Sequence, residues 1–67
     1  NKIGLIKYIF IELSHIELYK NQPLFTEVLD FLKKKNFILT SISNKTFSDK
    51  KLIQADYLFI NKKYVSK

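Results

Sequence analysis

Residues suited to acid–base chemistry or ligand binding occur at two places in the sequence. His15 follows an apolar run and could remove a proton from a substrate hydroxyl, because an imidazole titrates near pH 6.5. Its structural alternative is a loop histidine whose ring is satisfied by backbone groups. The candidates for substrate contacts are the polar residues near His15 and those before the last apolar run: Glu12, Glu17, Tyr19, Gln54 and Asp56.

Each substrate candidate also has a structural alternative. A carboxylate in an apolar strand needs a partner, so Glu12 could anchor the following loop through backbone N–H groups. An aromatic residue such as Tyr19 often serves packing, and Gln54 and Asp56 could hold a turn. The sequence leaves these alternatives open.

The composition excludes several kinds of site. The 67 residues include no cysteine and one histidine, which argues against thiolate chemistry and against zinc sites built from Cys or His. Gly4 is the single glycine, whereas glycine-rich phosphate and cofactor loops need several. We expect any cofactor cradle to lie outside this chain.

Lysine dominates the charge. Twelve lysines, no arginines and six acidic residues give a net charge of +6. The lysines are scattered along the sequence, which favours a solvated surface over a nucleic-acid partner, although a basic interaction or nucleic-acid-binding module is the alternative function. No apolar run approaches the ~20 residues that span a bilayer, and the start does not resemble a signal peptide. We therefore expect a cytoplasmic protein without a membrane partner.

The hydrophobic patterns predict a strand, a helix and two further strands. Residues 5–13 form the first strand, with apolar residues on both faces at its centre. Pro23 opens an amphipathic helix through Lys35, and Asn36 is a left-handed cap. Residues 37–42 and 55–61 are strands, separated by a predicted loop over 43–54. The apolar stripe of the helix comprises Leu24, Phe25, Val28, Leu29, Phe31 and Leu32.

These elements predict an α/β fold with one helix on a three-stranded mixed sheet. A strand–helix–strand unit makes a right-handed crossover, and the third strand returns antiparallel. The third strand is apolar on both faces, so burial places it between the other two. Its first residues then meet the end of the first strand, which brings Gln54 and Asp56 towards Glu12 and His15 at one rim, where ligands of α/β sheets bind.

One helix covers one face of such a sheet, and the other face also carries apolar residues. We expect that face to be covered either by the rest of a larger domain or by a second copy in a homodimer. The sequence contains no methionine and begins at Asn1, so we interpret residues 1–67 as a single partial domain.

Several short motifs carry a resemblance that spans about residues 9–60. They are IELS at 11–14, LY at 18–19, QPLF at 22–25, EVL and FL in the helix, and QAD at 54–56 followed by LF. In this order and spacing, they resemble the C-terminal part of FkbM-family methyltransferases. Asn36 stands where that family commonly has glycine, a departure that a left-handed cap tolerates.

The resemblance implies the C-terminal portion of a Rossmann-like class I methyltransferase that uses S-adenosylmethionine. Such enzymes usually methylate a hydroxyl oxygen of a small molecule or saccharide, and this segment would form one wall of the acceptor site. In that fold the last, antiparallel strand lies between the two preceding it, the order that burial alone predicts here. The family's glycine-rich loop and ribose-binding acid are absent, so we expect this chain by itself to be inactive.

Overall fold

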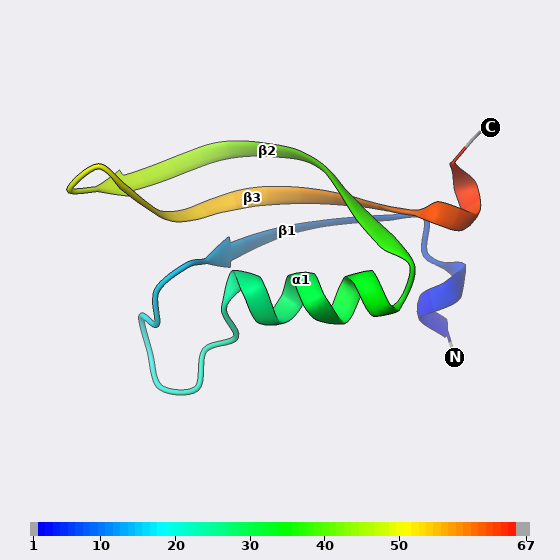
Figure 1. The fold of residues 1–67 in the computed structure, drawn as a ribbon, viewed down its shortest axis with the longest axis horizontal. Helices are drawn as coiled ribbons and strands as arrows, with labels where there is room; N and C mark the ends of the chain where they lie inside the picture. The colour runs from blue at the N-terminus through cyan, green and yellow to red at the C-terminus, as the bar shows by residue number, and fades with distance from the viewer. Residues whose placement is uncertain (1, 66–67) are drawn as a thin grey trace.

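The computed structural model describes residues 2–65, which form two layers, a sheet and a helix (Figure 1). Strand β1 (Tyr8–Ser14) leads through a long loop to helix α1 (Phe25–Lys34). Strands β2 (Phe37–Ser48) and β3 (Lys51–Asn61) follow as a hairpin. Short 3-10 turns, η1 (Lys2–Leu5) and η2 (Lys62–Tyr64), lie at the two ends of this described region.

The strand order is β1-β3-β2, as burial predicted, with β3 in the centre. Both neighbouring pairs, β1 with β3 and β2 with β3, are antiparallel. The prediction of a mixed sheet is therefore wrong, because the two strands that run in the same direction are separated by β3 and never pair. The structure is a small α/β domain with a three-stranded antiparallel sheet over residues 2–65.

Three strand boundaries differ from the sequence predictions. The first strand begins at Tyr8, because residues 2–5 form η1. The second continues to Ser48 and the third begins at Lys51, so the predicted loop over 43–54 is wrong and most of it is paired strand. The connection is the two-residue turn Asp49–Lys50, with φ angles of 52° and 66°, as type I′ hairpin turns require.

Helix α1 begins two positions later than predicted, at Phe25 instead of Pro23. Leu24 is the N-cap, which places Pro23 just before the helix, and the Leu24 N–H donates to Glu27 Oε1 at 2.8 Å. Lys33 and Lys34 lie in the last turn, where they oppose the negative end of the helix dipole. Asn36 has a φ of 70°, which confirms the predicted left-handed cap.

The core lies between α1 and one face of the sheet. Its buried members are Leu13, Leu32, Phe37, Ala55, Tyr57 and Phe59. The predicted core residues of the helix are confirmed, since Leu32 is buried and Phe25 and Leu29 pack against the cluster. Phe31 is an exception to the predicted stripe, because its side chain is 52% exposed.

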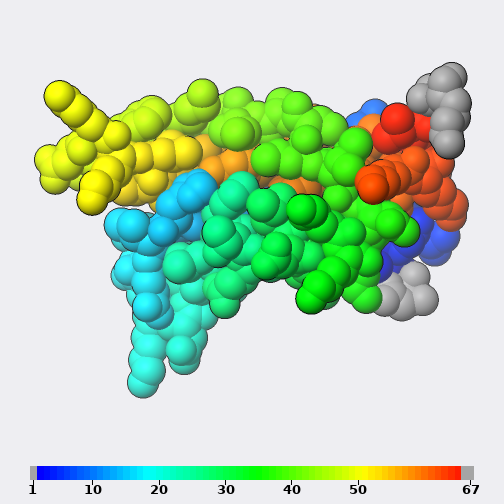
Figure 2. Space-filling model, in the orientation of Figure 1, coloured from blue at the N-terminus to red at the C-terminus, as the bar shows by residue number. Residues whose placement is uncertain are grey.

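The opposite face of the sheet is uncovered within residues 2–65. Tyr8 and Phe10 of β1 point to it and are 53% and 64% exposed, and their partners in β3 are Ile60 and Leu58. The prediction that the helix would cover one face only is confirmed. The hairpin also projects beyond the helix, and every residue from 40 to 51 is exposed (Figures 1 and 2).

Candidate functional site

The fold brings three of the predicted site residues together on the uncovered face. Glu12 of β1 lies directly opposite Asp56 of β3 in the antiparallel register. Gln54 Nε2 donates to Glu12 Oε2 at 2.9 Å, and Asn44 Nδ2 of β2 donates to Asp56 Oδ2 at 2.6 Å. Facing carboxylates on neighbouring strands repel each other, and these two amide donors offset part of that repulsion.

Glu12 therefore has a side-chain partner rather than the backbone partner considered from the sequence. Its carboxylate is bound to the amide of Gln54, a residue 42 positions away. Because a carboxylate offers about four lone-pair sites, the single hydrogen bond from the Gln54 amide leaves Glu12 able to accept another from a ligand hydroxyl.

His15 lies just beyond β1 and belongs to a separate aromatic cluster. Its Nε2 forms a hydrogen bond with the hydroxyl of Tyr57, and its ring stacks on Phe25 with centroids 4.6 Å apart. Phe25 and Tyr57 are also 4.6 Å apart, so the three rings contact one another. The backbone N–H of His15 donates to the Ile53 carbonyl at 2.7 Å. These contacts hold the start of the loop against the sheet.

Burial of Tyr57 affects the protonation of its phenol, the group that contacts His15. Desolvation raises the pKa of the Tyr57 phenol above its ordinary value of 10.0. The phenol is protonated at neutral pH and can donate to the lone pair of His15 Nε2, and the raised pKa extends that protonated range to higher pH. An Nε2 engaged in this way is available to a substrate proton only after the Tyr57 contact opens.

The loop from residue 15 to 24 is held by its own polar side chains. Glu17 Oε2 accepts from the Asn21 N–H at 2.7 Å, and Gln22 Oε1 accepts from the Leu18 N–H at 2.6 Å. Gln22 Nε2 in turn donates to Ser14 Oγ at 3.0 Å. Glu17 thus stabilises a turn and does not contact Glu12, Gln54 or Asp56. Tyr19 is exposed by 65%.

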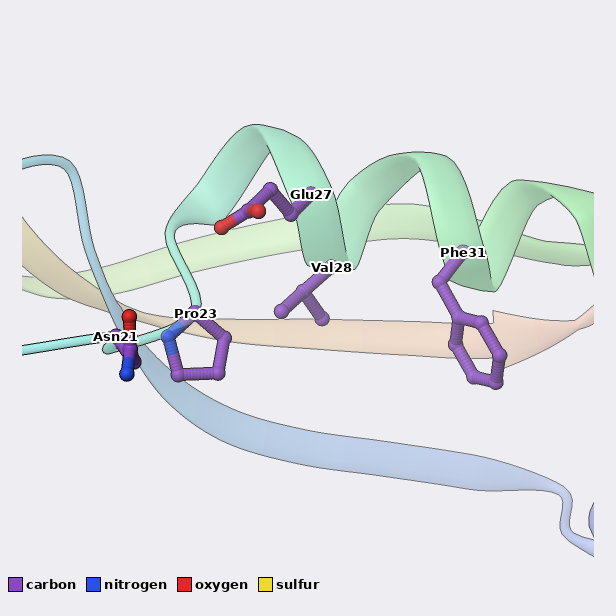
Figure 3. A pocket seen from close by; sticks show the side chains of 5 residues that line it. All are labelled: Asn21, Pro23, Glu27, Val28 and Phe31. Carbon is purple, nitrogen blue, oxygen red and sulfur yellow. The ribbon is translucent and has the colours of Figure 1, made fainter.

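Two adjacent pockets follow the outer edge of β1. One, of about 220 Å³, brings Glu12 and Tyr19 together; its other lining residues are Ile11, Leu13, Ser14, Gln22, Pro23 and Val28. The second, of about 310 Å³, lies towards the helix and is lined by Asn21, Pro23, Glu27, Val28 and Phe31 (Figure 3). Pro23 and Val28 line both, so the two hollows are neighbours.

Sequence reasoning missed three partners of the site. Asn44 of β2 donates across the sheet to Asp56, and Gln22 donates to Ser14 at the start of the loop. These two hydrogen bonds depend on a hairpin and on a loop conformation that the sequence pattern did not reveal. Tyr57 had a detectable signal, because a tyrosine at a fully buried strand position needs a partner for its hydroxyl.

Residues 2–65 contain one glycine, so they include no glycine-rich loop of the kind that cradles a cofactor. Gly4, the single glycine, lies in η1, and a Cβ added there meets nothing within 4 Å. No protein atom therefore requires a glycine at this position. Residues 2–65 also contain no group of three acidic or histidine side chains placed to hold a metal ion.

Comparisons with known proteins give no relative for this chain. No family model, curated protein or solved structure matches it.

Proposed function

We propose that this chain is the C-terminal, acceptor-side segment of an S-adenosylmethionine-dependent methyltransferase that transfers a methyl group to a hydroxyl oxygen of a small molecule or saccharide. The observation that carries the proposal is the position of β3. It lies between β1 and β2, antiparallel to both, which is the arrangement that the FkbM-family resemblance implies for the end of a Rossmann-like class I domain.

The polar rim supports the acceptor side of this proposal. Glu12, Gln54 and Asp56 come from opposite parts of the chain and meet at the end of β1. Beside them, the pocket that contains Glu12 and Tyr19 offers a carboxylate and an aromatic surface, a combination suited to a hydroxylated ligand. The cofactor would be held by residues outside this chain, since a single glycine cannot form a glycine-rich cofactor loop.

The proposed roles follow the contacts. Glu12 accepts a hydrogen bond from the acceptor hydroxyl and orients its oxygen, while Gln54 holds the Glu12 carboxylate in place. Orientation is the main requirement when a sulfonium supplies the methyl group. His15 is a positioning residue rather than the base, because its Nε2 is engaged by Tyr57 and its ring is stacked on Phe25.

Calorimetric titration of S-adenosylmethionine tests the assignment. The two samples are this 67-residue chain and the product of the complete reading frame that encodes it. We expect binding by the complete product and none by the chain alone. Binding by neither sample, or a reading frame that encodes nothing beyond these residues, would contradict the proposal.

A pair of conservative variants of the complete product tests the acceptor site. Glu12→Gln should raise KM for the acceptor and lower kcat/KM by about tenfold or more, since a charged hydrogen bond contributes roughly 1.5–3 kcal/mol. Glu17→Gln is the matched control, because that carboxylate holds a loop turn. An equal fall in kcat/KM in the two variants would show that Glu12 does not contact the acceptor.

A further inference from the structure

Lysines that are scattered in the sequence gather at one end of the molecule. Three segments meet there: the chain before β1 with the start of that strand, the turn after α1, and η2 (Figure 1). Figure 2 shows the corresponding blue, green and orange-red atoms crowded at the same end. The seven lysines of this basic end are Lys2, Lys7, Lys33, Lys34, Lys35, Lys62 and Lys63. All are exposed except Lys35, which is half-buried.

Hydrogen bonds fix these segments together. The Asn61 N–H donates to the Lys7 carbonyl at 2.9 Å, and Asn61 Nδ2 donates to the Ile6 carbonyl at 3.0 Å. The Lys62 N–H donates to the Asn36 carbonyl at 2.8 Å. The basic end is therefore a fixed part of the fold, formed where β3 ends.

The charge of the molecule is strongly separated. Residues 2–7, 33–36 and 61–65 contain the seven lysines and no acidic residue. The other described residues carry four lysines against six acids, so they are net negative. The overall excess of positive charge thus lies at the basic end and not over the whole surface.

Exposed apolar side chains lie among these lysines. Leu5 is 71% exposed and Ile6 is 42% exposed, both at the start of the chain, and Tyr64 and Val65 follow at 39% and 40%. Lysine side chains also lie over neighbouring aromatic rings, with Lys63 Nζ 5.6 Å from the centroid of Tyr64. Ammonium groups mixed with exposed aliphatic and aromatic groups match a bilayer interface, which is anionic at its surface and apolar beneath.

We propose that the basic end binds the surface of an anionic membrane. The lysines attract acidic headgroups, and Leu5, Ile6, Tyr64 and Val65 insert among them. A nucleic acid fits this surface less well, because arginine is absent and solvent-exposed aliphatic groups gain nothing from a phosphate backbone. No helix within residues 2–65 has the length and apolarity to span a bilayer. This proposal differs from the sequence-based expectation of no membrane partner, and the vesicle measurements below decide between the two.

Vesicle sedimentation of the 67-residue chain tests the proposal. The probes are vesicles of phosphatidylcholine alone and vesicles that also contain phosphatidylserine. We expect binding to the mixed vesicles only. Binding should weaken steeply when salt is raised from about 0.1 M to about 1 M, as the Debye length falls from about 10 Å to about 3 Å. Absence of binding to mixed vesicles at low salt would overturn the proposal.

Matched variants locate the binding surface. The triple variant K33Q/K34Q/K35Q should weaken vesicle binding at least about tenfold, while K20Q/K45Q/K50Q, with the same change of charge elsewhere, should have little effect. Circular dichroism checks that both fold, and K62Q/K63Q, which lies outside α1, replaces the first variant if it does not. Equal weakening by the variants at both ends would overturn the proposal.

A pair of leucine variants distinguishes membrane binding from nucleic-acid binding. Leu5→Ser should weaken vesicle binding several-fold, whereas Leu18→Ser, an exposed leucine in the loop after β1, should not. A single-stranded oligonucleotide serves as the competing polyanion. Tighter binding of that oligonucleotide than of vesicles, unchanged by Leu5→Ser, would identify a nucleic-acid surface instead. None of these measurements depends on methyltransferase activity, so the two proposals fail independently.

Discussion

A hydroxyl group at a buried position distinguishes Tyr57 from Phe59, its neighbour on the same face of β3. Both side chains are almost fully buried, but only Tyr57 reaches a polar partner, His15. The imidazole therefore ties the loop after β1 to the central strand. From the sequence, His15 was a candidate base because its partner, 42 positions away, could not be identified from local pattern.

Tyr57→Phe tests the value of this contact. The variant keeps the ring but leaves the imidazole without its hydroxyl partner, so the free energy of unfolding should fall by about 1 kcal/mol. Urea denaturation measures the change. Tyr8→Phe is the control, because that hydroxyl is on an exposed side chain; a fall as large in the control would show that the His15 contact contributes nothing.

The buried phenol also predicts a loss of stability at alkaline pH. Its pKa is raised in the folded state above 10.0, so the folded chain keeps a proton that the unfolded chain releases. Stability is therefore complete below pH 10 and declines as pH rises through the folded pKa. The difference in 295 nm absorbance between wild type and Tyr57→Phe isolates this group, and a midpoint at or below 10 would contradict the prediction.

At the scale of elements, the β2–β3 hairpin is where the sequence was most misleading. Residues 43–54 are polar and lack alternation, which is typical of a loop. The distal hairpin is exposed on both faces, so no burial pattern marks its strands, and pairing with β3 is what orders β2. The turn was also concealed, because Asp49–Lys50 adopts positive φ angles without a glycine.

Lys50→Gly should stabilise the hairpin. Lysine at a φ of 66° pays a steric cost that glycine avoids, so we expect the free energy of unfolding to rise by about 0.5–1 kcal/mol. Lys51→Gly is a matched control with the opposite sign, because Lys51 is the first residue of β3. Thermal unfolding of both variants gives the comparison, and a loss of stability in Lys50→Gly would contradict the assigned turn geometry.

At the scale of the whole molecule, the burial of apolar side chains determines the order of the strands and the position of the helix. The strand order was predictable because residues 57–60 are apolar on both faces, which requires a central position. The amphipathic helix was predictable from its single apolar stripe. The basic end was not, because its lysines come from segments that only the strand order and the hydrogen bonds of Asn61 bring together.

Two phenylalanine substitutions compare the two faces. Phe59→Ala removes a side chain with no exposed surface and should cost about 3–5 kcal/mol. A 67-residue domain has roughly 3–10 kcal/mol of stability, so this variant should lose a large fraction of it and melt at a markedly lower temperature. Phe10→Ala, 64% exposed on the uncovered face, should cost less than about 1 kcal/mol. Circular dichroism melting distinguishes them, and similar losses would show that the second face is also buried in solution.

The two edges of the sheet differ in regularity. The pairing of β2 with β3 shifts register between Leu39 and Ser41, between Ser43 and Thr46, and again before Phe47. The β1 pairing runs without a shift from Tyr8 to Ser14, and the bridge to Leu24 lies only at its end. Bulges twist an edge away from further strands, whereas a regular edge is a template for them. Further strands can therefore be added to this sheet on one side only. They can pair with the outer edge of β1, whereas the irregular edge of β2 ends the sheet.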